Sequence, residues 1–179
     1  MSASTWTESI AKKEAARDVL SLGQRFGEAV AIVVIFLVFL FFINNQIQDT
    51  GFFTSEFGTT EMILFYGSLL FGMFPPLLRL FLGRRNQVRP VDVVGNVLFV
   101  IAASYLIWVF PFDFSHLSDL FPESLKFLLD WITNDMVVVL FSFVIVIVII
   151  ASVWTAFLFI LVRDRLKRNP PASIEPISQ

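Results

Sequence analysis

Two groups of polar residues have the types and spacing to do chemistry, and the first contains the only histidine. Asp113, His116 and Asp119 recur at every third position, so a helical turn would bring two carboxylates and an imidazole together. A divalent metal accepts such ligands. Asp113 also follows Pro111 where a helix could begin, and Asp is a common helix N-cap. We therefore expect no metal site and keep the three residues as a secondary hypothesis.

The second group is Arg79, Asp92 and Asn96, which lie near the facing ends of two apolar stretches. Ionisable residues inside a membrane span often mark function. One hypothesis is a polar vestibule at the cytoplasmic mouth of the protein. The alternative, which we favour, is an ion pair at the membrane surface. In it Asp92 complements the first turn of its helix and Arg79 extends toward water.

The rest of the composition argues against an enzyme. The chain has no Cys and one His, which excludes thiol chemistry and bis-histidine haem ligation by this chain alone. It contains no Gly-x-Ser-x-Gly nucleophile motif and no Gly-rich phosphate loop. We expect neither catalysis nor a cofactor.

The elements that must position these residues are membrane helices. Of the 179 residues, 56% are hydrophobic and 16% are charged, whereas soluble domains carry about 25% charged residues. A spanning helix needs about 20 mostly apolar residues. Four stretches meet this requirement, at residues 26–43, 62–82, 91–112 and 136–162. They predict an all-α integral membrane bundle of four transmembrane helices, forming one domain over residues 1–168.

The basic residues predict the orientation. Twelve of the 13 lie before the first stretch, between or beside the second and third (Arg79 is inside the second, close to its end), or after the fourth, and only Lys126 lies elsewhere. The positive-inside rule then places both termini in the cytoplasm of a multi-pass protein, for which we favour the cell membrane. Basic residues beside a bilayer attract anionic lipid headgroups. We favour this interpretation over nucleic-acid binding.

Two segments outside the spans have the pattern of surface helices. Residues 6–25 predict a basic amphipathic helix on the inner leaflet that continues into the first span. Residues 122–132 carry apolar side chains at helical spacing and predict an interfacial helix on the outer surface, or alternatively a surface for an extramembrane partner. The tail, residues 169–179, contains three prolines and is predicted to be disordered.

Small residues four positions apart let helices approach closely. Such pairs occur in the second and fourth stretches, at Ser68 and Gly72, Ala151 and Thr155, and Ser152 and Ala156. These faces can pack within the chain or against another chain. In the second stretch, Pro75 and Pro76 predict a kink.

These features favour a small non-catalytic membrane protein, acting as a scaffold or an accessory subunit of a membrane assembly. The spans offer packing faces and hold no ionisable residue near their centres, where proton-coupled carriers need one. The alternative is an oligomeric channel or passive permease, with Arg79, Asp92 and Asn96 at its cytoplasmic mouth. The expected partners are the lipid bilayer and either a second copy or another membrane protein.

Overall fold

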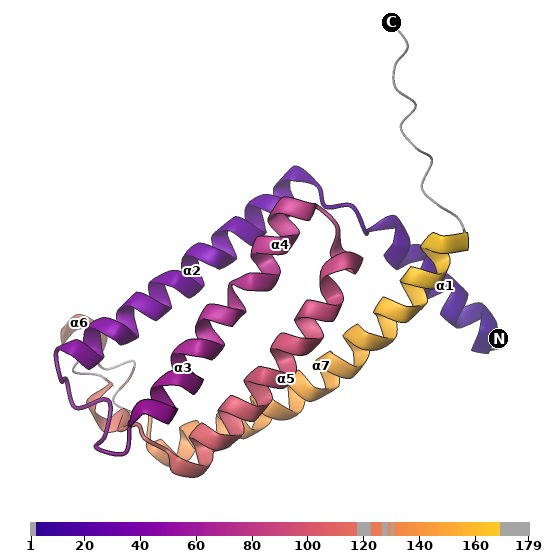
Figure 1. Cartoon of the computed structure of the whole chain (residues 1–179). Helices are drawn as coiled ribbons and strands as arrows, with labels where there is room; N and C mark the ends of the chain where they lie inside the picture. Colours follow the sequence, from indigo (N-terminus) through magenta and orange to yellow (C-terminus); the bar gives the residue numbers. More distant parts are fainter. Residues whose placement is uncertain (1–2, 118–122, 127–128, 130, 169–179) are drawn as a thin grey trace, which may run out of the picture.

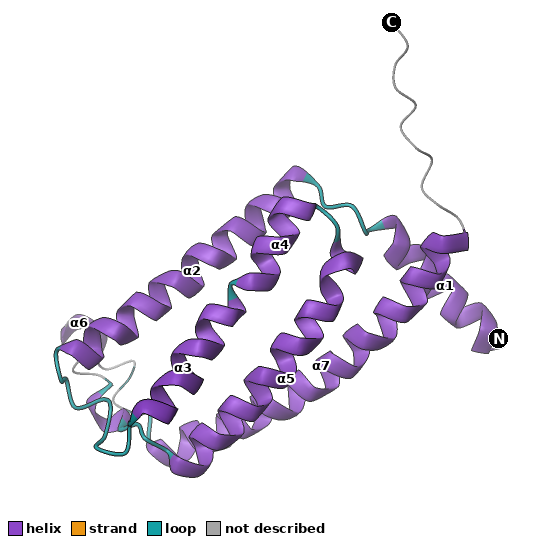
Figure 2. Cartoon of the chain, viewed as in Figure 1, coloured by secondary structure: helices purple, strands orange, loops and turns teal. Residues whose placement is uncertain are grey.

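The computed structural model is helical and describes residues 3–117, 123–126, 129 and 131–168 (Figures 1 and 2). Four of its helical segments are long and apolar enough to cross a membrane. The elements are α1 (Ala3–Ala16), α2 (Leu22–Ile47), α3 (Thr59–Gly72), α4 (Phe74–Leu82), α5 (Arg85–Val109), η1 (Phe114–His116), α6 (Glu123–Lys126) and α7 (Asn134–Arg168).

The four candidate spans are α2, α3 with α4, α5, and α7. The helix α2 packs against α3 and α4, these two pack against α5, and α5 makes its most extensive contact with α7. The first and last spans, α2 and α7, do not pack extensively against each other. We call the end that carries α1, residues 17–21 and the α4–α5 turn the basic end (Figure 1). The opposite end, with residues 48–58 and 110–117, is the aromatic end.

The second span is broken, as its two prolines predict. The helix α3 ends at Gly72 and α4 begins at Phe74, leaving a short non-helical gap that is visible in Figure 2. Pro75 and Pro76 have no N–H to donate to the carbonyls four residues earlier, so the α3 hydrogen bonds cannot continue. Both prolines then sit in the first turn of α4, where a missing N–H is tolerated.

The prediction of one continuous helix over residues 6–25 is wrong. The helix α1 ends at Ala16, and α2 begins at Leu22 behind a Ser21 cap. The link between them pairs with the α4–α5 turn: Leu20 N–H donates to the Gly83 carbonyl at 2.8 Å. The sequence does carry apolar residues at helical spacing. A helix cannot continue through the link, however, because the backbone groups there form hydrogen bonds with another segment.

The third span starts earlier and ends earlier than residues 91–112. It begins at Arg85 and contains Pro90, and it ends at Val109 because Phe110 adopts a left-handed conformation with φ 45° just before Pro111. Asp92 therefore lies about two turns inside the helix. The prediction that Asp92 complements the first turn of this helix is wrong.

The fourth span is longer than predicted. The 35 residues of α7 measure about 52 Å at 1.5 Å per residue, against a hydrocarbon core of about 30 Å. Its last turns extend past the other spans and pack against α1 at the basic end (Figure 1).

The predicted interfacial helix over residues 122–132 is shorter in the part that the structure describes. There α6 covers Glu123–Lys126, and Leu129 and Trp131 lie in turns. The other residues of this segment, and the tail at 169–179, lie outside the described residues.

Candidate functional site

The predicted vestibule contains a cluster of three charged side chains, which we call the Arg79 cluster. Arg79 on α4 donates from one Nη to both oxygens of Asp92 on α5, at 2.9 and 3.1 Å. On its other side, Arg79 Nε lies 3.0 Å from an oxygen of Glu28 on α2. This second contact is an ion pair by distance, but its angles are not those of a hydrogen bond. The cluster thus ties three helices together.

The third predicted vestibule residue, Asn96, lies apart from this cluster. It is half-buried one helical turn, about 6 Å, further along α5 than Asp92. In the described part of the chain no hydrogen bond joins Asn96 to Arg79 or Asp92. Glu28 takes the place beside Arg79 instead. The sequence shows Glu28 only as an interruption of the first apolar run, since nothing local places it next to Arg79.

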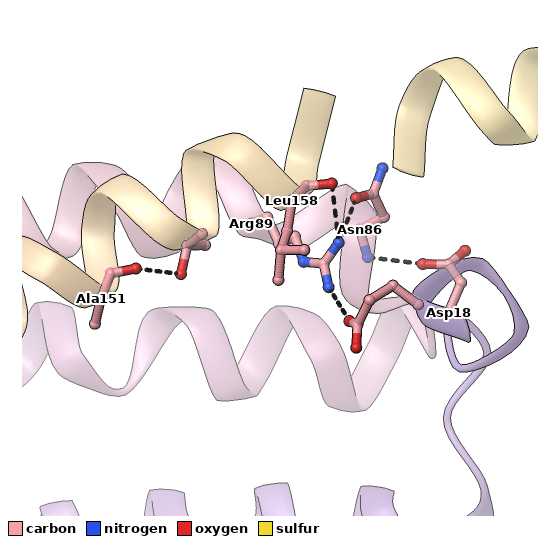
Figure 3. A network of polar contacts seen from close by, with 7 residues as sticks. Asp18, Asn86, Arg89, Ala151 and Leu158 are labelled. Atoms are coloured by element: carbon pink, nitrogen blue, oxygen red, sulfur yellow. Dashed lines mark hydrogen bonds and ion pairs between the residues drawn. The ribbon is translucent and has the colours of Figure 1, made fainter. Parts of the chain in front are cut away.

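A second polar network lies at the basic end and centres on Arg89, which is 8% exposed. Its guanidinium donates to Glu14 of α1 at 2.6 Å, to the Asn86 side chain at 3.0 Å and to the Leu158 carbonyl of α7 at 3.3 Å. These bonds converge on Arg89 (Figure 3), and their acceptors lie on α1, α5 and α7. One side chain therefore fixes α1 to the two spans that pack most closely.

Asp18 joins the same end of the molecule by capping α5 from outside. Its carboxylate accepts the Asn86 N–H at 2.7 Å (Figure 3). Its carbonyl accepts the Arg85 N–H at 2.9 Å. The first N–H groups of a helix have no partner within the helix. A carboxylate at this position satisfies one of them and complements the helix dipole. This external cap explains why α5 can start before Pro90.

We expect the substitution Asp18→Ala to lower the free energy of unfolding by about 1–2 kcal/mol, because the buried Asn86 N–H loses its acceptor. Denaturant titration of the protein in mixed micelles, followed by circular dichroism, measures this change. Asp18→Asn is the matched control, since it keeps an acceptor oxygen and should lose less than half as much. Equal losses in the two variants would contradict the capping role.

The aromatic end is closed by two short backbone segments that pair with each other. Thr54 N–H donates to the Pro111 carbonyl at 3.1 Å, and Asp113 N–H donates to the Phe52 carbonyl at 2.8 Å. The rings of these segments pack edge to face or tilted, with Phe52 only 2% exposed. We call these two segments, residues 52–54 and 111–114, the aromatic lid, and its buried rings form part of the core.

Beneath this lid lies a cavity of about 380 Å³ between α2, α3, α5 and α7. Of its lining residues only Ser68 is polar, and its hydroxyl donates to the Phe65 carbonyl of its own helix at 2.8 Å. The cavity is therefore apolar.

Of the three residues in the metal hypothesis, Asp113 and His116 belong to the described part of the structure. Asp113 accepts from both the N–H and the hydroxyl of Ser115, at 3.0 and 2.6 Å, which lowers the pKa of Asp113 below its ordinary 3.8. His116 Nε2 lies 3.9 Å from the other Asp113 oxygen. Asp119 lies outside the described residues, and among those described no three metal-ligating side chains gather. The geometry of Asp113 is that of a turn cap.

The predicted packing residues are distributed over different surfaces. Ser68 lines the cavity, whereas a Cβ added at Gly72 would meet no atom within 4 Å. On α7, Ala151 is exposed and the Thr155 hydroxyl donates to its carbonyl at 2.8 Å; Ser152 and Ala156 are half-buried.

One close approach between two helices involves a glycine that lies in none of the predicted pairs. A Cβ at Gly95 of α5 would come within 2.9 Å of the Phe71 ring on α3. In the sequence, Gly95 appears only as a small residue within an apolar run. A small residue allows a close helix approach only when a bulky side chain such as Phe71 lies opposite it, and the sequence does not show which residue lies opposite.

The sequence also gave no indication of the contact between Glu61 and Tyr105. Glu61, 7% exposed at the start of α3, accepts the Gly58 N–H at 3.0 Å and the Tyr105 hydroxyl at 2.8 Å. This contact links α3 to α5 near the aromatic end, as the Arg79 cluster links α4 to α5 near the basic end. In the part of the chain that the structure describes, Arg79, Arg89 and Glu61 are thus each bound to protein partners on a neighbouring helix.

Comparison of the chain with protein-family models, with curated proteins and with solved structures found no match.

Proposed function

We propose that the chain is a non-catalytic multi-pass protein of the cell membrane that serves as a scaffold or accessory subunit of a membrane assembly. Its basic end would face the cytoplasm. Twelve of the 13 basic residues belong to α1, to the turns and helix ends beside it, or to the last turns of α7. The positive-inside rule supports this orientation, and anionic headgroups would add about 1 kcal/mol for each nearby Lys or Arg.

The observation that carries the proposal is that charged side chains between the helices form ion pairs with one another. Arg79 binds Glu28 and Asp92, and Arg89 binds Glu14. A carrier or an enzyme needs charged groups that can exchange partners with a substrate or proton. Here the same groups hold neighbouring helices together, which favours a structural role.

The outer faces of the first and last spans are the surfaces available to a partner. Exposed apolar side chains run along α2 and α7, with Phe36, Leu37 and Leu40 on α2 and Phe143, Ile147 and Ile150 on α7. Ala151 interrupts the bulky side chains of α7 and would allow another helix to approach its backbone.

The alternative is an oligomeric channel or passive permease whose mouth is formed by Arg79, Asp92 and Asn96. This reading needs a polar path that continues from the mouth between the helices. In the described structure the cavity between the helices has an apolar lining and provides no such polar path. We therefore favour the scaffold over the channel.

Purification from native membranes in mild detergent, with mass measurement and identification of associated proteins, tests the proposal. A scaffold or accessory subunit should be recovered at fixed stoichiometry with a defined membrane protein. The substitution Ala151→Leu should weaken that association, whereas Ile150→Leu, which preserves bulk on the same helix, should not. A partner-free species that conducts ions or solutes in liposomes would overturn the proposal in favour of the channel.

A further inference from the structure

We propose that the cavity below the aromatic lid is a binding site for one hydrocarbon chain of a bilayer phospholipid. Its volume of about 380 Å³ lies within the 300–1,000 Å³ range that is typical of small-molecule sites. A cavity of this size is much larger than the voids between well-packed side chains. It therefore has room for a ligand that the chain itself does not supply.

The chemistry of the lining selects a hydrocarbon. The walls are formed by aliphatic and aromatic side chains from four helices, among them Val38, Leu69, Leu106 and Val144. The one hydroxyl, on Ser68, is already engaged with a backbone carbonyl. Water needs two or more polar partners to remain in a buried site, and this lining provides none that is free.

The route of entry is set by the arrangement of the spans. Toward the aromatic end, the cavity is covered by Phe52, Phe112 and Phe114, and the lid is fastened to α7 by the Phe114 N–H, which donates to the Asn134 side chain at 2.8 Å. On the side, α2 and α7 both line the cavity but are not among the extensively packed pairs. A molecule enters more easily between these two helices than through the lid.

The surroundings of α2 and α7 identify the occupant. Both helices have the length and hydropathy of membrane spans, so lipid chains surround their outer faces. The chain of a phospholipid can pass between them while its headgroup stays at the membrane surface. This binding does not depend on whether the protein is a scaffold or a channel.

Photolabelling with a phosphatidylcholine that carries a diazirine on one acyl chain tests the site in the full-length protein, reconstituted in vesicles. Adducts are mapped by mass spectrometry on two leucine-sized residues of α5. Leu106 lines the cavity and is 8% exposed, whereas Ile101 is 58% exposed and faces outward. The proposal predicts adducts at both positions.

Two pairs of valines provide matched variants. Val144→Phe on α7 fills the cavity and should reduce the Leu106 adduct at least fivefold without changing the Ile101 adduct. Val146→Phe, two residues along α7 on an exposed position outside the lining, should leave both adducts unchanged. Val38→Phe and Val34→Phe on α2 repeat the comparison, so one poorly folded variant does not decide the result.

Labelling of Ile101 without Leu106 in the unmodified protein would overturn the proposal. Equal Leu106 labelling in a folded cavity-filling variant and its control would also overturn it. Either result can occur whether or not a partner protein co-purifies, so failure of the lipid site is distinguishable from failure of the proposed function.

Discussion

Replacing Arg89 with alanine is expected to lower the free energy of unfolding by about 3 kcal/mol. Removal of one member of a buried ion pair typically costs about 3–5 kcal/mol, because the remaining charge stays desolvated. The lower end applies here because the Glu14 side chain is still 24% exposed. The Leu158 carbonyl also loses its donor from Arg89.

Equilibrium unfolding in mixed micelles measures the loss, and limited proteolysis shows where the structure opens. Because Arg89 holds α1 against α5 and α7, cleavage between α1 and α2 should accelerate in Arg89→Ala. Arg84→Ala is the matched control. Arg84 is exposed and pairs with Val19 through its backbone, so its loss should stay within about 0.5 kcal/mol. Comparable losses in both variants would contradict the role assigned to Arg89.

The second large effect is expected for Arg79→Leu, which should also cost about 3 kcal/mol. In this variant Glu28 and Asp92 lose their shared cation while remaining 19% and 22% exposed. Two partly buried carboxylates without a counter-ion are destabilising through both desolvation and mutual repulsion.

A joint replacement separates the charge effect from a packing effect. Combining Arg79→Leu with Glu28→Gln and Asp92→Asn removes the uncompensated charges and should recover about half of the lost stability. Lys167→Leu, at an exposed position in the last turn of α7, controls for the loss of one positive charge. If the triple variant is no more stable than Arg79→Leu alone, the cluster does not act through charge compensation.

Much of the membrane architecture could be predicted from local sequence. Each of the four apolar stretches matches a long apolar helical segment, with the third extending three residues past its helix, because the length of an apolar run sets whether it can cross a bilayer. The break near Pro75 and Pro76 was equally local, since a missing N–H acts within one helical turn. The pairing of Arg79 with Asp92 could be anticipated because a short turn joins their helices.

The errors arose where a distant segment changed a local preference. Residues 6–25 have the periodicity of one helix, yet the backbone groups of Asp18 and Leu20 bond to residues 85 and 83, and the Asp18 side chain bonds to residue 86. Pro90 looked like a helix start, yet Asp18 caps α5 from 68 positions away and moves the start to Arg85. Periodicity and capping rules describe one segment at a time, so they cannot include a cap supplied from elsewhere.

The sequence by itself determined the class of this protein, the number of its apolar spans and the separation of its basic residues from its acidic loops. These properties depend on composition and on the free energy of moving residues between water and lipid, which are additive along the chain. Only the tertiary structure decided that Glu28 joins Arg79, that Arg89 links three helices and that an apolar cavity lies under the aromatic lid. Such contacts depend on distances between segments far apart in the chain, which packing fixes and local pattern does not.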